Sequence, residues 1–289
     1  RTTIDCMAPM LRTYRHGDGA FALFNDSHEE SAWLIDVVLA QTNSRARAHM
    51  DAPQTGFRRL QAGRTLIIVD SGKPASIGNR VHAGTMSFEL SIGKERLLVN
   101  CGTWLGGDET WRAALRATAA HTTLAVDDTN SSELLPGGGV GIGPTQVTVE
   151  RIEKDGAILL TLGHDGFLEP FGLMHDRRIY LSDDGYDIRG EDVLRPKEGI
   201  AAGRSFAIRF HLHPTVQASL VQAGSSILLR MPSGTGWQMR TKGCNMDLAE
   251  SIYSGQPGER RRSNQIVLTG PIHPKENFIN WSLKRIPKN

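Results

Sequence analysis

The most regular pattern of hydrophobic and polar positions lies in residues 80–100, RVHAGTMSFELSIGKERLLVN. Over residues 87–92 apolar side chains alternate with polar ones, which is the period of a β-strand with one buried face. Residues 93–95, Gly-Lys-Glu, have the composition of a turn, and residues 97–99 form a second short apolar run. The pattern therefore predicts a β-hairpin.

Three polar residues lie next to these apolar runs. His82 precedes the first predicted strand of the hairpin, and Asn100 follows the second. Farther along the chain, His121 stands directly before another apolar run. Because the ends of antiparallel neighbours meet at the same edge of a sheet, we expect these three side chains to lie close together.

The chain from residue 53 to residue 289 has the pattern of an all-β domain. It contains many short apolar runs separated by turn residues, and several runs flank an Asp-Gly or Gly-Ser pair of the kind that closes hairpins. Few stretches in this part have a helical period. Closely spaced short strands with few helices predict an antiparallel β-sandwich.

Residues 1–52 have a different pattern. IDCMAPMLRTYRH predicts a helix that ends before residues 17–19, Gly-Asp-Gly. ESAWLIDVVLAQT predicts a second helix, in which one set of residues is spaced like one helical face. That set comprises Trp33, Leu34, Val37, Val38 and Gln41.

Composition excludes several classes of protein. The chain has 289 residues, 39% hydrophobic and 22% charged, which is ordinary for a globular protein. Its net charge of +2 is compatible with an anionic ligand and far below the charge of a nucleic-acid-binding protein. The three cysteines are widely spaced, so we expect neither a disulfide framework nor a Cys-x-x-Cys zinc site.

No apolar run is long enough to predict a membrane span. The chain begins with Arg rather than Met, so we expect a fragment or a processed product.

Two segments, VHAGTMSFELSIGKERLLVNCGT and WRAALRATAAHTTLAVDDTNSSE, resemble the C-terminal domain of the heparinase II/III-like polysaccharide lyases. The family pattern has a His-x-His-Ala-Asp stretch, a Ser-Phe-Glu-Leu strand, a later Asp and an Ala-His-Asn-Thr stretch. Aligned on the Ser-Phe-Glu-Leu strand at residues 87–90, the second family histidine falls on His82 and the third on His121. GHDGF, HDRRIYL and RFHLHP extend the resemblance over most of the chain from about residue 55.

The chain departs from the family pattern at three positions. Arg80 stands where the family has its first histidine, Gly84 where the motif has Asp, and Asn100 where the later Asp falls. The resemblance implies a super-sandwich fold in which residues 1–52 are the last helices of an α/α-toroid; a small helical cap on the sandwich is the alternative for this segment.

The resemblance implies β-elimination on a polysaccharide that contains uronic acid. Such an enzyme must neutralise the C5 carboxylate, remove the C5 proton and assist the O4 leaving group. Arg80 and His82 are the candidate catalytic residues, although a guanidinium stays protonated and would clamp a carboxylate rather than act as a base. Asn79, Arg80 and Arg116 are the candidate substrate-binding residues. Alternatively, Arg80 is a surface loop residue.

The resemblance also implies a zinc site at His82, Asn100 and His121. Two imidazoles, a carboxylate and a water suit the tetrahedral preference of zinc, but Asn100 stands at the position of the carboxylate. A neutral amide is a poor zinc ligand, so the alternative is a hydrogen-bonded polar cluster that fixes the hairpin. His211 and His213 have the spacing of a metal pair on one strand, but we expect a structural role for them. Residues 259–262, Glu-Arg-Arg-Arg, predict an exposed loop that could attract a polyanion.

Two functional hypotheses follow. The chain is the sandwich half of a polysaccharide lyase, inactive by itself, or it is a non-catalytic carbohydrate-binding or assembly module that has lost the catalytic residues. The expected partners are an anionic polysaccharide or oligosaccharide and the helical toroid; a homodimer stays open, and neither nucleic acid nor a membrane is expected. The periplasm and the cytoplasm of a bacterium both stay open as the compartment.

Overall fold

The computed structural model describes residues 3–42, 44–75, 78, 80–197 and 203–287. Two helices come first, α1 (Thr3–Thr13) and α2 (Ala32–Gln41), and strands follow almost without interruption. The strands of the hairpin region are β1 (Asp51–Ala52), β2 (Phe57–Ala62), β3 (Thr65–Asp70), β4 (Phe88–Ile92), β5 (Glu95–Val99) and, after the helix α3 (Glu109–Arg116) and the 3-10 turn η1 (Thr118–Ala120), β6 (Leu124–Val126).

Longer strands make up the second half of the chain. They are β7 (Val147–Lys154), β8 (Ala157–His164), β9 (Leu173–Leu181), β10 (Asp187–Pro196), β11 (Ser205–Leu212), β12 (Gln217–Val221), β13 (Ser226–Arg230), β14 (Gly236–Lys242), β15 (Asn245–Tyr253), β16 (Arg261–Pro271) and β17 (Asn277–Arg285). Two short helical segments interrupt them, α4 (Leu168–Phe171) and η2 (Gln222–Gly224).

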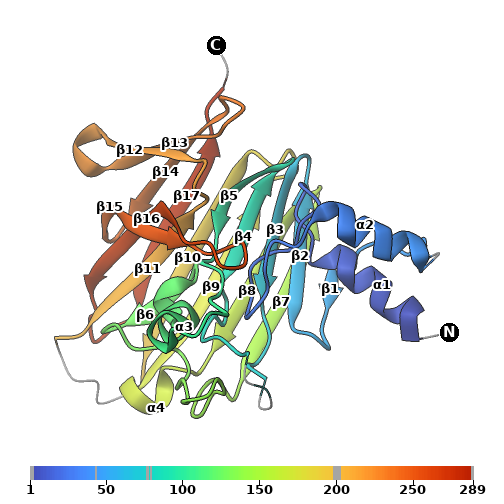
Figure 1. Ribbon diagram of the computed structural model, residues 1–289. Helices are drawn as coiled ribbons and strands as arrows, with labels where there is room; N and C mark the ends of the chain where they lie inside the picture. Colours follow the sequence, from blue (N-terminus) through green and yellow to red (C-terminus); the bar gives the residue numbers. More distant parts are fainter. Residues whose placement is uncertain (1–2, 43, 76–77, 79, 198–202, 288–289) are drawn as a thin grey trace.

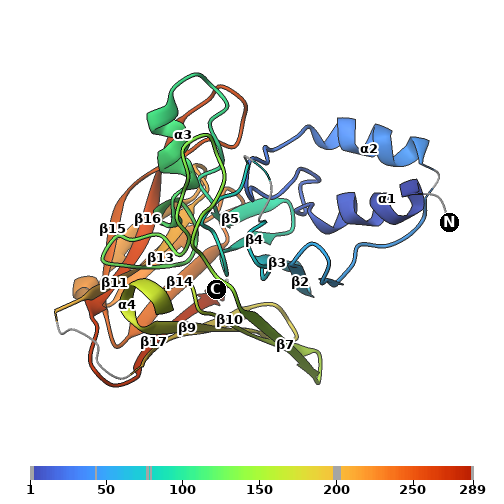
Figure 2. The same ribbon diagram turned by 90° about the horizontal axis from the view of Figure 1, so that it is seen from below.

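The strands form two sheets in which all neighbouring strands run antiparallel. One sheet has the order β1-β2-β3-β4-β5-β11-β16-β15, with β6 paired to β11, and the other has the order β12-β13-β14-β17-β10-β9-β8-β7. Seen from below, the sheets lie as two layers, with α3 at one end and α1 and α2 side by side beyond β2 and β3 (Figure 1, Figure 2). The antiparallel β-sandwich predicted from the sequence is confirmed.

One large hydrophobic core fills the space between the sheets. Phe88 of β4 and Trp281 of β17 stack there with ring centroids 5.7 Å apart, and Phe210 of β11 packs edge-on against Trp281 at 5.0 Å. These side chains come from both layers and are almost fully buried. Apolar burial of this kind supplies the main driving force that holds the layers together.

The first helices pack differently from the prediction. Ile35 and Leu39 are the buried side chains of α2, and they contact Ala8 of α1. Trp33 is 72% exposed, and Leu34 and Val38 are exposed as well. The residues that the sequence places on one helical face are therefore not the ones that pack against α1. Because α2 is apolar almost all round, the spacing of its apolar residues did not indicate which side faces α1.

The hairpin at residues 88–99 has the predicted strands, but its burial differs from the prediction. All five residues of β4 are buried, including Glu89 and Ser91 on the face predicted to be polar and exposed. The segment that connects α1 with α2 covers this face, and His16 of that segment contacts both Glu89 and Ser91. The polar face of β4 thus becomes an internal site. In the described part of the chain, no helix has the length and hydrophobicity of a membrane span.

Candidate functional site

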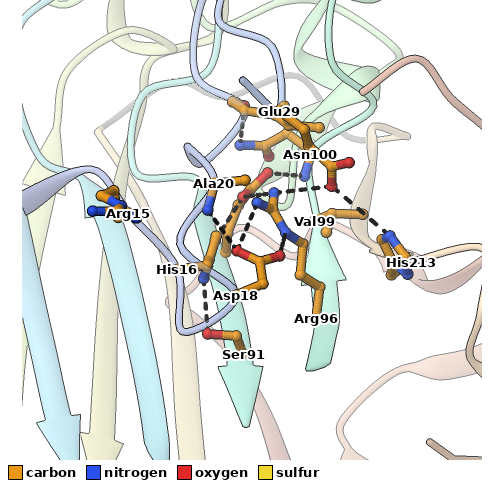
Figure 3. A network of polar contacts seen from close by, with 12 residues as sticks. Arg15, His16, Asp18, Ala20, Glu29, Ser91, Arg96, Val99, Asn100 and His213 are labelled. Carbon is orange, nitrogen blue, oxygen red and sulfur yellow. Dashed lines mark hydrogen bonds and ion pairs between the residues drawn. The ribbon is translucent and has the colours of Figure 1, made fainter. Parts of the chain in front are cut away.

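A network of polar side chains lies on the covered face of the hairpin (Figure 3). Glu89 of β4 is fully buried; its Oε2 lies 2.9 Å from Nε2 of His16, and its Oε1 accepts a hydrogen bond of 2.7 Å from the Asn100 backbone N–H. The other ring nitrogen of His16, Nδ1, lies 2.8 Å from the hydroxyl of Ser91. The polar residues of β4 are thereby paired with a histidine of the connecting segment, as buried polar groups must be.

Arg96 of β5 extends this network toward the surface. Its guanidinium donates to Asp18 with a distance of 2.8 Å from Nε to Oδ2, and it lies 3.2 Å from Glu29. Glu29 in turn accepts a hydrogen bond from the hydroxyl of Tyr253, on β15. Carboxylates of the connecting segment therefore compensate the buried guanidinium from two sides, and the network fastens residues 16–29 to the sheet.

The two histidines singled out from the sequence contact each other. Nδ1 of His82 lies 3.2 Å from Nε2 of His121, and Nε2 of His82 lies 3.0 Å from Oδ1 of Asp26. Asp26 also accepts a hydrogen bond of 2.7 Å from the hydroxyl of Thr103, and Nδ1 of His121 lies 2.8 Å from the carbonyl of Ala117. Both imidazoles are buried, with 3% and 2% exposure.

Counting protons assigns the donors in this cluster. A carbonyl only accepts, so Nδ1 of His121 carries a proton that it donates to Ala117. In neutral His121, Nε2 is then an acceptor for a proton on Nδ1 of His82. A hydrogen bond between Nε2 of His82 and Asp26 consequently requires one further proton. If Nε2 carries it, the contact is an ion pair between an imidazolium and a carboxylate.

The pKa shifts support a neutral His121 but oppose the additional proton on the contact between His82 and Asp26. Burial, with a smaller contribution from the neighbouring His82, lowers the pKa of His121 to about 3, so His121 is neutral at physiological pH. Burial also lowers the pKa of His82, while the carboxylate of Asp26 opposes that shift. Burial raises the pKa of Asp26, but hydrogen bonds from His82 and Thr103 outweigh it, so the net shift is downward.

Asn100 is fully buried beside the histidines but binds backbone groups instead of a ring. Its Nδ2 donates a 3.0 Å hydrogen bond to the carbonyl of Leu23, and its Oδ1 accepts one of 3.0 Å from the backbone N–H of Thr122. The amide therefore ties the end of β5 to the connecting segment on one side and to the strand that follows His121 on the other.

In this arrangement His82, Asn100 and His121 do not fit a zinc ion. The ring nitrogens of both histidines and both polar atoms of the Asn100 side chain are used in the contacts described above. Among the residues that the structure describes, no group of three or more His, Cys, Asp or Glu side chains is placed to hold a metal ion. The geometry therefore favours the hydrogen-bonded cluster, and we derive no chemistry through a metal.

Gly84 explains one departure from the family pattern. A Cβ atom added at this residue would lie 2.7 Å from Cδ2 of the His121 ring, which is closer than real side chains approach. The ring of His121 thus occupies the space that an Asp side chain at residue 84 would need. With His121 packed in this way, residue 84 has no room for the Asp side chain of the family pattern.

The candidate substrate-binding residues have different surroundings. Arg80 is exposed and has no hydrogen bond or ion pair with a described residue, whereas Asn79 lies outside the described residues. Arg116 is buried, and its guanidinium donates to backbone carbonyls, among them Val81 at 3.0 Å and Gly139 at 2.8 Å. Substrate binding by these residues stays a prediction, and for Arg116 the structure shows a role in holding two loops.

A second buried network lies between the sheets. Asp192 of β10 accepts hydrogen bonds from Arg177 at 2.7 Å and from Trp281 at 3.0 Å, and its Oδ1 lies 2.8 Å from Nε2 of His175. Nδ1 of His175 lies 3.2 Å from Nε2 of His164. Asp192, Arg177, His164 and His175 are all buried, so this carboxylate compensates a guanidinium inside the core.

Neither Asp26 nor His16 was identified from the sequence. Both lie in the irregular segment between the first two helices, and their partners are 56 and 73 residues away along the chain. No spacing links an isolated Asp or His to a strand so far downstream. A cation–π contact was likewise not identified from the sequence: the guanidinium carbon of Arg260 lies 4.6 Å from the ring centres of both Trp104 and Trp111.

Comparison with known proteins agrees with the fold. The family model of the heparinase II/III-like C-terminal domain matches residues 44–282. The chain belongs to this family. The heparinase II/III-like assignment based on the Ser-Phe-Glu-Leu strand is thereby confirmed.

Two kinds of relative are similar to this heparinase II/III-like chain. The FtsZ-localized protein C of Caulobacter vibrioides is 30% identical over 98% of this chain and 51% of its own length. A heparan sulfate lyase, HepC of Pedobacter heparinus, superposes with a TM-score of 0.76 at 14% identity, over 96% of this chain and 45% of its own. A heparinase III structure has a TM-score of 0.76 at 13% identity, over 98% and 48%. The chain spans about half the length of these relatives, and the two lyases show the fold alone.

Replacement of Asn100 by Asp separates the hydrogen-bonded cluster from a zinc site. We expect Asn100→Asp to lower the free energy of unfolding by about 2–3 kcal/mol, since a carboxylate does not donate to the Leu23 carbonyl and leaves two acceptors facing each other. Urea unfolding measures this change. Zinc retention by Asn100→Asp, measured by elemental analysis after removal and re-addition of the metal, together with unchanged stability would instead indicate a metal site.

Proposed function

We propose that the chain is a non-catalytic assembly module, the sandwich half of a longer protein that localises with FtsZ. The observation that carries this proposal is the burial of His82 and His121, whose ring nitrogens are all engaged in contacts within the protein. The exposed residue at the neighbouring family position is Arg80, and a guanidinium does not accept a proton.

The chemistry of β-elimination supports this reading. A general base must lie within hydrogen-bonding distance of the proton it removes, about 3 Å, in contact with the bound sugar. His82 would reach a sugar only if Asp26 and the surrounding loops moved away from it, which would also leave the buried carboxylate without its partner. On this proposal, His82 and His121 do not act as an acid–base pair on a bound sugar.

The Caulobacter relative supports the assembly role. It covers 98% of this chain at 30% identity, far closer in sequence than the lyase structures at 13–14%. Its name records localisation with FtsZ. We extend that property to the protein that contains this chain.

Polysaccharide lyase activity is the second candidate function, and family membership favours it. In that case the other half of the protein would supply the acid–base residues. Arg80, together with Asn79, would clamp the carboxylate of an anionic polysaccharide, and Arg116 would hold the loops that contain Val81 and Gly139. An assay of the longer protein for the unsaturated uronate formed by β-elimination separates the two candidates.

A chimera tests the assembly role. In Caulobacter vibrioides, the matching half of the FtsZ-localized protein is replaced by this chain and the chimera carries a fluorescent tag. We expect the chimera to co-localise with FtsZ and a tagged protein that lacks this half to be dispersed. The proposal fails if the chimera is dispersed although immunoblotting shows it intact, or if the protein without this half still localises.

A further inference from the structure

A pocket lined by arginines lies between α1, the segment of residues 44–48 and β2. Its volume is about 430 Å³, and small residues and His16 make up the rest of its wall. None of its residues belongs to the cluster of His82, Asp26 and His121. The five cationic residues of the wall are Arg12, Arg15, Arg45, Arg47 and Arg59.

Arg59, on β2, is a partly buried cation without a counter-charge. Its NH1 donates to the carbonyls of Arg15, at 2.7 Å, and Thr13, at 3.2 Å, while its Nε is buried without a partner among the described residues. It has no ion pair with a described carboxylate, and burial lowers its pKa to about 10. A cation held in this way is unfavourable unless an anion approaches it.

The other arginines add charge that the described part of the chain does not neutralise. Arg45 and Arg47 are exposed and have no ion pair there. Arg12 donates to the carbonyl of Ser44 at 2.7 Å, and its NH1 is buried without a described partner. Arg15 alone has a carboxylate partner, Asp36, at 2.7 Å. Among the described residues, one carboxylate therefore pairs with the five cations of the wall.

The positive charge continues into an adjoining pocket of about 420 Å³, which shares Gly17 and Arg59 with the first. Arg64 and Lys94 lie in its wall, together with a single acidic residue, Glu95. Ligands longer than one phosphate or sulfate group would therefore meet further cations on this side.

We infer that the arginine pocket binds a compact polyanion carrying phosphate or sulfate groups. The planar guanidinium fork pairs two N–H donors with two oxygens of such a group, and several forks around one cavity favour a multiply charged ligand. Among the described residues no Phe, Tyr or Trp lines the first pocket, so charge and hydrogen bonding rather than stacking would select the ligand. This site is independent of the proposed assembly role.

Calorimetric titration of the purified chain at low salt tests the inference with two probes. Inorganic pyrophosphate represents free phosphate compounds, and sucrose octasulfate represents sulfate esters; the one that binds more tightly indicates the source of the natural ligand. We expect saturable binding of at least one probe. Absence of saturable binding for both would overturn the inference.

Two double variants locate the site. Arg45→Gln with Arg47→Gln removes two exposed cations from the pocket, and we expect about tenfold weaker binding or more. Arg230→Gln with Arg240→Gln removes two exposed arginines of β13 and β14 from the other sheet and is the matched control, for which we expect unchanged affinity. Equal weakening in both variants would show non-specific attraction and contradict the site, as would unchanged binding in the first.

Discussion

Acidification from about pH 7 to about pH 5 is expected to lower the free energy of unfolding, with His121 and His211 contributing about 2 kcal/mol each. Burial lowers the pKa of His121 to about 3 and that of His211 to about 4. Below about pH 6.5 the unfolded chain binds protons at these residues and the folded chain does not. The stability that they contribute is therefore present at neutral pH and is lost as the pH falls toward the folded values.

Protonation of Asp70 is expected to raise the free energy of unfolding over the same pH range. Burial raises its pKa to about 7, so the folded chain takes up a proton there before the unfolded chain does. This residue should offset about one histidine's contribution. Urea unfolding at a series of pH values measures the balance, and Asp70→Asn should make the loss of stability on acidification steeper.

Variants identify the groups that titrate. We expect His211→Gln to reduce the dependence of stability on pH by about one proton. The exposed His273, replaced by Gln, is the matched control and should leave that dependence unchanged. A stability that does not vary between about pH 7 and about pH 5 in either the wild type or Asp70→Asn would contradict the burial of these histidines.

Replacement of Asp192 by Asn should destabilise the chain by about 3–5 kcal/mol, because it leaves a buried guanidinium without a counter-charge. Arg177 is fully buried, and its other hydrogen bonds with described residues go to the backbone carbonyls of Met86, at 2.9 Å, and Thr122, at 2.8 Å. Asparagine keeps the size of the side chain but removes the charge. Chemical denaturation followed by far-ultraviolet circular dichroism measures the loss.

Asp187 provides the matched control on the same strand. It pairs with Arg189 and Lys284 near the surface, so Asp187→Asn should lower stability by about 1 kcal/mol or less. A double variant, Asp192→Leu with Arg177→Met, should recover part of the stability lost in Asp192→Asn, since it removes both buried charges. Similar losses of stability in Asp192→Asn and Asp187→Asn would show that the buried pair contributes no more to stability than the surface pair.

The sandwich could be predicted from the sequence because its strands have local signals. Strands β7 and β8 flank Asp155-Gly156, and β9 and β10 flank Asp184-Gly185, so the turn residues set the pairing of neighbouring strands. Phe88 and Leu90 alternate with polar residues at the period of a strand. The first two helices were likewise found from their periodicity.

Burial of polar residues could not be predicted in this way. Glu89 and Ser91 have the spacing of an exposed face, and only the approach of His16, from 73 and 75 positions upstream, makes that face internal. Asp26 acquires its role through His82, 56 residues farther along. Long-range partners of this kind leave no pattern in a single sequence. The meeting of His82 with His121 was predicted from their positions beside apolar runs at one sheet edge, and the family resemblance pointed to the same pair.

Assay of the longer protein that contains this chain tests the non-catalytic role most directly. The protein is incubated with a panel of polyuronates and sulfated glycans, and the ultraviolet absorbance of the unsaturated uronate formed by β-elimination is followed. We expect no increase above the rate without protein for any substrate. An increase that is abolished by Arg80→Gln, with the fold intact by circular dichroism, would contradict the account and establish the chain as part of a lyase.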